Sequence, residues 1–305
     1  MHIIQDKRAI SRAAHLLKRG EVVAFPTETV YGLGACVFCE DAVKKIFSIK
    51  GRPSDNPLIA HVAAIDDVER LAVDIPGAFY DLARAFWPGP LTMILRRREG
   101  VPDIVSAGHP TIAVRMPSHP MALDLICEVK EPLVAPSANL SGRPSPTSAS
   151  DVLEDLGALV PLILDGGACS IGIESSVIDL TRSQFTLLRP GAVSREELSA
   201  VLGAPVFEAS RQDPILSPGM KYRHYAPKAK MRLIFRKEDL PKENCYLLSS
   251  EEMPSAVVFN RQNFYAHLRK ADRLGVAEIT VYLAPNVLQD AGLMNRIFRS
   301  AGIES

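Results

Sequence analysis

VVAFPTETVYGLG, residues 22–34, is the stretch that decides the fold expected for this chain. Its first four residues, Val22–Phe25, form an apolar run that predicts a buried β-strand. Pro26 ends the run, and the residues that follow combine polar side chains with two glycines, which predicts a loop. Because binding side chains usually gather in loops at strand ends, we expect a functional site next to this strand.

Working outward, apolar residues alternate between helical and strand-like spacing. A helix is predicted before Gly20, and a second one is predicted around Val43, Ile46 and Phe47. Lys50 falls at the next position of that second apolar stripe, so its side chain is expected to point inward. Ala78–Phe86 also has helical spacing. Further strands are predicted at Leu58–Val62, Leu91–Leu95, Thr111–Met116, Pro132–Ala135, Leu162–Leu164, Ser176–Leu180 and Thr186–Leu188. The alternation predicts an α/β fold.

The pattern lapses between residues 204 and 230, where Pro and Gly are frequent. This predicts a linker, although its run KYRHY, residues 221–225, is richer in stacking and hydrogen-bonding groups than a spacer needs. Beyond it, short strands alternate with two helices. We therefore predict a first domain over residues 1–203, a linker over 204–230 and a small second domain over 231–305.

Composition limits the function classes. The chain has 305 residues, and its 35 Lys and Arg balance its 35 Asp and Glu, so a strongly basic nucleic-acid binder is not indicated. The amino-terminal residues lack the pattern of a signal peptide, and no apolar run reaches the length of a membrane span. Together with the odd number of cysteines, five, this predicts a cytoplasmic protein without membrane contact.

Four cations lie beside Gly, Ser or Pro: Lys50, Arg52, Arg115 and Arg189. Guanidinium and ammonium groups next to free backbone N–H groups favour phosphate or carboxylate binding. The sequence shows neither the P-loop pattern nor a complete dinucleotide-binding glycine motif, so an ATP site would be of another type. No nucleophile has a neighbouring base, and a lone strand histidine such as His61 is more often packed than catalytic. From the residues themselves we predict an α/β protein with a cationic site able to bind phosphate.

Several motifs, in their order, resemble the threonylcarbamoyl-AMP synthase family with its YrdC-type fold. They are Pro26–Leu33, Lys50–Pro53, Asn56–Leu58 and Ala135–Gly142. Ser217–Pro227 resembles the linker of the long form of these enzymes, and Arg269–Asp272 and Asn295–Ala301 resemble its smaller terminal domain. The resemblance implies a twisted α/β sheet around a concave, positively charged cavity, followed by a small Rossmann-like domain.

The resemblance also implies an activity, that of a nucleotidyltransferase. L-threonine, bicarbonate or CO2, and ATP would give threonylcarbamoyl-AMP and pyrophosphate. Partner transferase proteins would then move the threonylcarbamoyl group to the adenosine beside the anticodon of certain tRNAs, with direct contact to RNA left open. Mg2+ is expected with ATP, without metal ligands from the protein.

The site residues implied by the resemblance fall into three groups. Lys50 and Arg52 would serve catalysis at the phosphates. The residues expected to contact threonine are Thr29, His61, Arg115, Ala135 and Ser175. Those expected to contact ATP are Arg52, Asn56, Thr111, Ser137, Ser145, Arg189 and Tyr225. The place of Tyr225 in the linker predicts a lid across the cavity.

Two alternatives remain open at this point. The same fold is linked to double-stranded RNA binding, which would appear as a salt-dependent RNA affinity without ATP turnover. The second alternative is carbamoyl transfer, as in hydrogenase-maturation proteins that share the domain. Those proteins carry paired zinc-finger cysteines and an acylphosphatase segment, and neither is found in this sequence.

Overall fold

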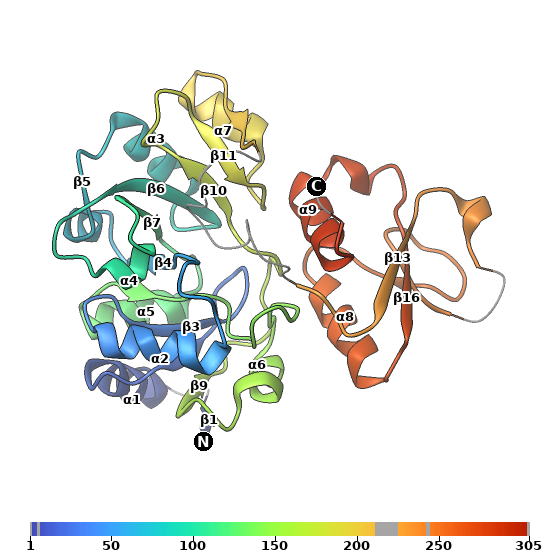
Figure 1. Cartoon of the computed structure of the whole chain (residues 1–305), viewed down its shortest axis with the longest axis horizontal. Helices are drawn as coiled ribbons and strands as arrows, with labels where there is room; N and C mark the ends of the chain where they lie inside the picture. The colour runs from blue at the N-terminus through green and yellow to red at the C-terminus, as the bar shows by residue number, and fades with distance from the viewer. Residues whose placement is uncertain (1, 5–6, 211–224, 242–244, 304–305) are drawn as a thin grey trace.

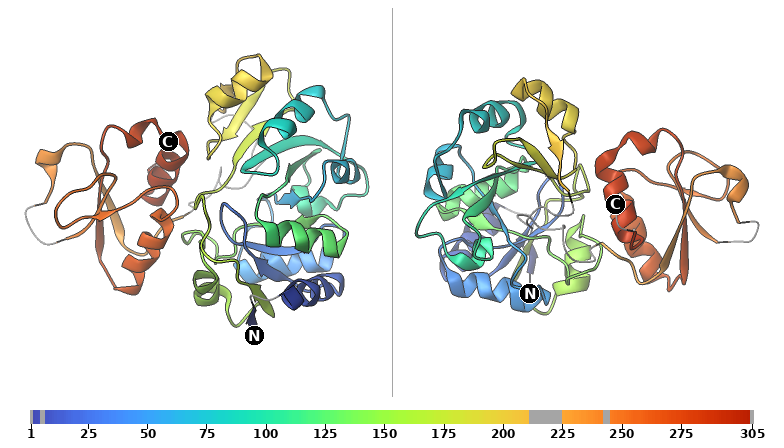
Figure 2. Two further views of the ribbon diagram at one scale, coloured as in Figure 1. Left: turned by 180° about the vertical axis from the view of Figure 1, so that it is seen from behind. Right: turned by 45° about the horizontal axis from the view of Figure 1, so that its top comes forward.

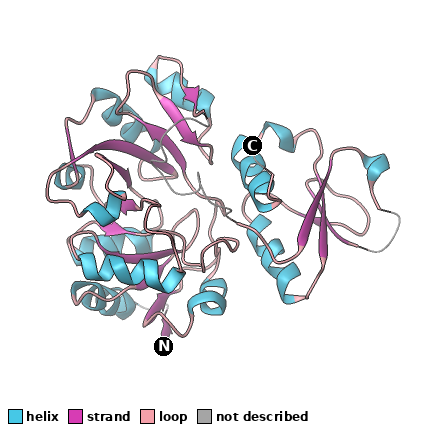
Figure 3. Cartoon of the chain, in the orientation of Figure 1, coloured by secondary structure: helices cyan, strands magenta, loops and turns pink. Residues whose placement is uncertain are grey.

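The computed structural model describes residues 2–4, 7–210, 225–241 and 245–303. Within these residues the strands form two separate sheets, one of twelve strands and one of four. We call the part built on the first sheet the larger unit and the part built on the second sheet the terminal unit. Figure 1 shows them side by side, and Figure 3 shows helices on both. The protein is thus a mixed α/β structure, as the sequence predicted.

The large sheet mixes parallel and antiparallel neighbours. Its order is β1-β9-β2-β3-β8-β4-β7-β6-β10-β11-β12, with β5 paired to β6 outside this path. β4 and β7 are parallel and end next to each other, so His61 lies opposite Arg115. The strands are β1 (His2–Ile4), β2 (Val23–Phe25), β3 (Gly32–Cys36), β4 (Ile59–His61), β5 (Ala72–Val73), β6 (Leu91–Arg97), β7 (Thr111–Arg115), β8 (Leu133–Val134), β9 (Leu162–Leu164), β10 (Ser176–Asp179), β11 (Thr186–Arg189) and β12 (Phe207–Glu208).

Helices of the larger unit cover this sheet with their apolar faces. α1 and α5 pack on one cluster of buried side chains with Val23 and Phe25, whereas α2, α3 and α7 pack on another with Ala24 and Leu33. Alternate residues of β2 thus face opposite cores, as the two-residue period of a strand requires. The helices are α1 (Lys7–Lys18), α2 (Glu40–Lys50), α3 (Gly77–Phe86), α4 (Asp103–Ser106), α5 (Pro120–Val129), α6 (Ala149–Leu156) and α7 (Arg195–Leu202).

One expectation was wrong: the loop predicted over residues 26–34 ends early, because Gly32–Cys36 is strand β3. β3 runs antiparallel to β2, with Phe25 opposite Gly32 and Val23 opposite Gly34. A Cβ atom at Gly34 would stand 2.6 Å from the Phe25 ring. Gly34 therefore makes room for an aromatic ring of the neighbouring strand, a role that local turn propensity does not reveal.

Other predicted elements are confirmed with small shifts in their ends, including the strands that became β4, β6, β7, β9 and β10. The sequence reasoning missed α4, α5, α6, α7, β1, β5 and β12. β12 lies inside the predicted linker and pairs with β11, which extends the large sheet to Glu208, past the predicted boundary at residue 203. β13 begins at Lys230, the last residue of the predicted linker.

The terminal unit is an all-parallel sheet in the order β13-β16-β14-β15. Its strands are β13 (Lys230–Ile234), β14 (Tyr246–Ser249), β15 (Val257–Val258) and β16 (Glu278–Tyr282), and its helices are α8 (Phe264–Arg273) and α9 (Ala291–Ser300). In Figures 1 and 2, α8 and α9 lie on the side of this sheet that faces the larger unit. The predicted β/α alternation is confirmed here.

The core of the terminal unit continues into the larger unit. Val30 and Ile173 belong to the same buried cluster as Phe264, Tyr265 and Ile297 of α8 and α9. Val30 adjoins Thr29, and Ile173 lies two positions before Ser175. Apolar burial therefore holds the terminal unit against the loops that carry the predicted site.

We expect Gly34→Ala to lower the free energy of unfolding by about 1–3 kcal/mol, because its methyl group would overlap the Phe25 ring. Urea unfolding followed by circular dichroism measures this change. Gly77→Ala is the matched control. A Cβ there meets no heavy atom of the described residues within 4 Å, so it should leave stability unchanged or slightly higher. Equal stability of Gly34→Ala and wild type would contradict the steric role of Gly34.

Candidate functional site

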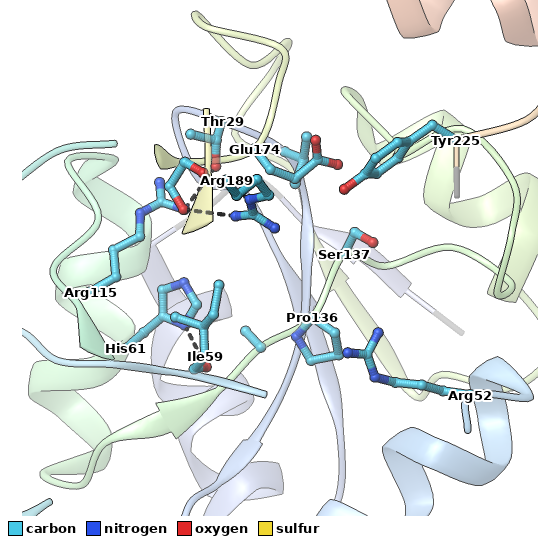
Figure 4. Close-up of a pocket in the computed structure, with 13 residues that line it drawn as sticks. Thr29, Arg52, Ile59, His61, Arg115, Pro136, Ser137, Glu174, Arg189 and Tyr225 are labelled. Carbon is cyan, nitrogen blue, oxygen red and sulfur yellow. Dashed lines mark hydrogen bonds between the residues drawn. The ribbon is translucent and has the colours of Figure 1, made fainter. Parts of the chain in front are cut away.

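A cavity opens where β4 and β7 end, between the loop after β2 and the loop before β10. Figure 4 shows three guanidinium groups, an imidazole and a tyrosine ring gathered around it. The residues that line it are Thr29, Val30, Arg52, Ile59, His61, Arg115, Ala135, Pro136, Ser137, Glu174, Ser175, Arg189 and Tyr225. Several distant segments of the chain therefore meet at one place.

The loop after β2 is shaped by Thr27. Its hydroxyl donates to the carbonyl of Val30 at 2.6 Å and accepts from the amides of Thr29 and Val30, each at 3.2 Å. This side-chain turn replaces backbone hydrogen bonds that a tight polar loop cannot otherwise make. The Thr29 side chain is left facing the cavity.

Arg115 ends β7 with its guanidinium buried. It donates to the Thr29 hydroxyl at 2.9 Å and to the Glu28 carboxylate at 2.5 Å, while its Nε donates to the carbonyl of Gly89 at 3.2 Å. The second Glu28 oxygen accepts from the Ser118 amide at 3.0 Å. Arg115 is thus held rigidly by the protein, and its charge at the cavity is partly balanced by Glu28.

His61 lies beside Arg115 on the neighbouring strand and is buried. Burial, reinforced by the positive charge of Arg115, lowers the pKa of His61 to about 3, so the imidazole is neutral at physiological pH. Its Nδ1 lies 3.2 Å from the carbonyl of Ile59, and the ring meets Phe25 edge to face at 6.4 Å. The expectation of a packed strand histidine is confirmed, but the ring also lines the cavity.

Arg189, at the end of β11, is anchored to the loop before β10. Its Nε donates to the carbonyl of Ser175 at 3.0 Å and an Nη donates to the Ser175 hydroxyl at 3.1 Å. That hydroxyl also lies 2.8 Å from the hydroxyl of Thr92 on β6. Burial lowers the pKa of Arg189 below its ordinary value, yet a guanidinium remains charged.

Arg52 follows α2 after the left-handed residue Gly51, which ends the helix. Its guanidinium donates to the backbone carbonyls of Asn56 at 3.2 Å and Pro57 at 2.9 Å. Burial lowers the pKa of Arg52 to about 10, which leaves it positively charged near neutral pH. Asn56 thus positions Arg52 through its main chain. The side-chain oxygen of Asn56 is buried and has no hydrogen-bond partner among the described residues.

Lys50 is buried, as its position on the apolar stripe predicted. Its ammonium does not line the cavity; it donates to the carbonyl of Asn139 at 2.6 Å and to that of Ser137. The carbonyl of Lys50 accepts from the Ser141 amide at 2.8 Å, so one residue fastens both ends of this loop. Burial holds the pKa of Lys50 well below its ordinary value.

Glu174 is the carboxylate that sequence reasoning missed. It lines the cavity, and its oxygens accept from Ser145 at 2.5 Å, Tyr265 at 3.0 Å and Arg296 at 2.7 Å. Although burial raises its pKa, Arg296 and Arg189 hold the pKa of Glu174 below the ordinary value, so it is ionised. A charged residue just before the apolar strand Ser176–Leu180 was the signal available in the sequence.

Tyr225 is the first described residue after the gap at 211–224, and its side chain lines the cavity. Its ring packs on Tyr265 at 5.5 Å between centroids, and the Arg296 guanidinium lies 5.6 Å from its centroid. The remaining residues of the predicted lid, Lys221, Tyr222, Arg223 and His224, lie outside the described residues.

Nine of the residues predicted from the sequence line this one cavity: Thr29, Arg52, His61, Arg115, Ala135, Ser137, Ser175, Arg189 and Tyr225. Lys50, Asn56, Thr111 and Ser145 do not. Lys50 and Asn56 stand directly behind lining residues, and the Ser145 hydroxyl donates to Glu174. Thr111 starts β7, about 13 Å along the strand from Arg115, and borders a different hollow with Arg96 and Arg97. A contact between Thr111 and ATP stays a prediction, which this position does not support.

The described residues contain no group of three or more His, Cys, Asp or Glu side chains placed to hold a metal ion. They also contain no helix with the length and apolarity that crossing a bilayer requires.

Two sequence models of known protein families match this chain. The sequence model of Sua5, YciO and YrdC proteins, described as "Telomere recombination", matches residues 15–191. The chain belongs to this family. A second model, described as the C-terminal domain of threonylcarbamoyl-AMP synthase, matches residues 193–302. The two matches together include every strand of both sheets except β1.

Curated relatives within the family carry the name threonylcarbamoyl-AMP synthase. The protein of Pyrococcus abyssi is 51% identical and that of Bacillus subtilis 49%, each over 73% of this chain. The matched region spans 66% of the length of each of these two relatives. The Schizosaccharomyces pombe protein is 37% identical over 98% of this chain and 90% of its own length.

A solved family member has the same fold over its whole length. The crystal structure of P. abyssi Sua5 complexed with L-threonine aligns with a TM-score of 0.91 and 40% identity. It covers 99% of this chain and 98% of the solved one. The arrangement of the larger and terminal units is therefore that of an experimentally known Sua5 protein.

The neutral state of His61 predicts a pH dependence of stability. An unfolded histidine takes up a proton below about pH 6.5, whereas the folded one stays neutral down to about pH 3, so stability falls as pH drops through this window. His61 contributes a slope of up to about 1.4 kcal/mol per pH unit. We expect His61→Gln to lose less stability than wild type between pH 6.5 and 4 in urea titrations. Parallel losses in both proteins would contradict a buried neutral His61.

Proposed function

We propose that this protein is a threonylcarbamoyl-AMP synthase. L-threonine, bicarbonate and ATP would give threonylcarbamoyl-AMP, pyrophosphate and water. The observation that carries the proposal is the convergence of Arg52, Arg115 and Arg189 on one cavity, in a chain whose relatives bear that name. Three guanidinium groups around one space suit a pair of anions, a carboxylate and a polyphosphate.

Threonine would occupy the end of the cavity near β4 and β7. Arg115 would bind its carboxylate there with help from the Thr29 hydroxyl, since both point into the cavity. Because His61 is neutral, it adds no second positive charge that would compete with Arg115 for the carboxylate. Ala135 and Ser175 complete this end. The L-threonine bound to P. abyssi Sua5 supports the class of ligand.

ATP would occupy the end nearer Arg52, Ser137 and Tyr225. Arg52 and Arg189 would neutralise phosphate charge, and the Tyr225 ring would cover the nucleotide. Lys50 would act by fixing the Ser137 loop, which makes it a positioning residue, while Arg52 would be the catalytic cation at the phosphates.

The cavity in this structure is too small for both substrates. Its volume is about 60 Å³, whereas sites for small molecules commonly measure about 300–1,000 Å³. Tyr225 is a lining residue next to the chain between the two units. We infer that Tyr225 moves aside when ATP enters.

The reaction needs no nucleophile from the protein. The threonine amine captures CO2 as a carbamate, a carbamate oxygen attacks the α-phosphorus, and pyrophosphate leaves. Holding the two anions in line and stabilising charge on the phosphates can supply the rate. Mg2+ would enter as its complex with ATP, with the phosphate oxygens as its ligands. Transferase proteins of tRNA modification would consume the product.

RNA binding by the larger unit receives less support. Arg96, Arg97 and Arg98 form the cationic run on the surface, but each already has a protein acceptor. Arg96 pairs with Asp74 at 3.0 Å, Arg97 with Asp103 at 2.7 Å, and Arg98 donates to the carbonyl of Glu69.

The proposal is tested by incubating the pure protein with Mg2+, ATP, threonine and labelled bicarbonate. We expect pyrophosphate release together with a labelled adenylate that contains threonine, seen by chromatography and mass spectrometry. Omission of threonine should abolish both signals. Pyrophosphate release that does not depend on threonine would contradict the proposal.

The substitution Arg115→Lys tests threonine binding separately from ATP binding. Lysine keeps a positive charge next to buried Glu28 but cannot form the two-pronged contact with a carboxylate. By isothermal calorimetry we expect threonine affinity to fall at least about tenfold, because a charge-assisted hydrogen bond contributes about 1.5–3 kcal/mol. ATP affinity should change by less than about threefold. An unchanged affinity for threonine would show that Arg115 does not hold it.

A further inference from the structure

Two buried arginines of the terminal unit pair with carboxylates of the larger unit. Arg296 on α9 donates to Glu174 at 2.7 Å, and Arg269 on α8 donates to Asp155 at 2.9 Å. Both guanidinium groups are almost completely buried. Glu174 lines the cavity whereas Asp155 does not, so the two pairs differ in what they can do to a ligand.

Glu174 places a negative charge in the cavity wall. Within the described part of the chain it is the one carboxylate among the lining residues, beside Arg52, Arg115 and Arg189. A polyphosphate bound among these cations would be repelled by an uncompensated carboxylate in the same cavity wall, since buried charges are weakly screened. The cavity therefore needs a partner for Glu174 that does not itself occupy the ligand's space.

Arg296 is such a partner. It donates through Nε to a Glu174 side-chain oxygen and through Nη2 to the Glu174 carbonyl at 3.1 Å. Its other Nη donates to the carbonyl of Pro190 at 2.9 Å, next to Arg189. Arg296 does not line the cavity. The same guanidinium thus neutralises Glu174 and fastens the main chain beside Arg189.

The docking of α9 fixes the place of this guanidinium. A Cβ at Gly292 would stand 2.3 Å from the carbonyl oxygen of Gly191, so α9 meets the main chain of the larger unit directly. Gly292 lies one helical turn before Arg296 and on the same face. Tyr265 of α8 adds a hydroxyl donor to Glu174 at 3.0 Å, and its ring supports Tyr225.

We propose that Arg296 is a positioning residue for ATP, which neutralises and orients Glu174 so that the cavity presents a net positive wall to the triphosphate. The terminal unit is then a working part of the nucleotide site. This inference rests on the proposed function, since it assigns the triphosphate to this cavity. Arg296 acts through Glu174 and Pro190 and does not touch the substrate.

The test measures ATP affinity by calorimetry with Mg2+, without threonine or bicarbonate, on the full chain. Arg296→Met should weaken ATP binding at least about tenfold, because Glu174 loses the guanidinium that is hydrogen-bonded to it. Adding Glu174→Gln to Arg296→Met removes that charge and should restore affinity to within about threefold of wild type. Arg296→Lys, which keeps the charge, should also stay within about threefold.

Arg269→Met is the matched control. It removes an equally buried arginine across the same interface, but Asp155 keeps Arg143 at 2.5 Å as a partner. We expect its melting temperature to fall while its ATP affinity stays within about threefold of wild type. A similar loss of ATP affinity in Arg269→Met would show that any weakening of the interface has this effect, and would overturn the proposal.

Each outcome either supports or contradicts the role of Arg296 in ATP binding. If Arg296→Met binds ATP like wild type, or binds weakly without rescue by Glu174→Gln, charge neutralisation by Arg296 is wrong. If Arg296→Met does not fold, the double variant and Arg296→Lys carry the comparison, since neither leaves an uncompensated Glu174. Weak binding by both would overturn the proposal. If wild type itself fails to bind ATP, the proposed function fails. If wild type binds ATP and the variants behave otherwise than expected, only the inference about Arg296 fails.

Discussion

A guanidinium group taken out of water must find acceptors inside the protein, and this requirement organises the structure around the cavity. Arg115 finds Glu28, Thr29 and the carbonyl of Gly89. Arg52 donates to main-chain carbonyls, and Arg189 donates to the carbonyl and hydroxyl of Ser175. Because carbonyls carry no full charge, those bound to Arg52 offset its positive field less than the Glu28 carboxylate offsets that of Arg115.

The loops that carry the site are fixed by the same kind of contact. Lys50 holds the loop of Ser137 from behind, and Thr27 holds the loop of Thr29. Residues that look catalytic in a sequence can therefore serve the site by shaping it. Such second contacts keep ligand groups within the narrow range of positions that catalysis by orientation needs.

The two units share this electrostatic arrangement. Apolar packing of Val30 and Ile173 with Phe264 and Tyr265 brings α8 and α9 against the larger unit. Their arginines then compensate carboxylates on its side of the interface. The helices α8 and α9 of the terminal unit thus stand behind one wall of the cavity, next to Glu174.

The sequence by itself determined the α/β class, most strands of the large sheet and the anion-binding character of the site. It could do so because apolar periodicity and cations beside Gly, Ser and Pro are local signals. Family resemblance gave the roles of nine residues that line one cavity, three of which, Arg52, Arg115 and Arg189, also stand out as cations in the sequence. Local signals failed at Gly32–Cys36, where a neighbouring aromatic ring explains Gly34, and at helices such as α5.

Only the tertiary structure decided which charges stand in the cavity wall and which stand behind it. Lys50 and Arg52 are two positions apart in the chain, yet one fastens a loop and the other faces the cavity. Glu174 and Arg296 are far apart in sequence and meet across the two units. The field at a site depends on distances between residues remote along the chain, and folding alone sets those distances.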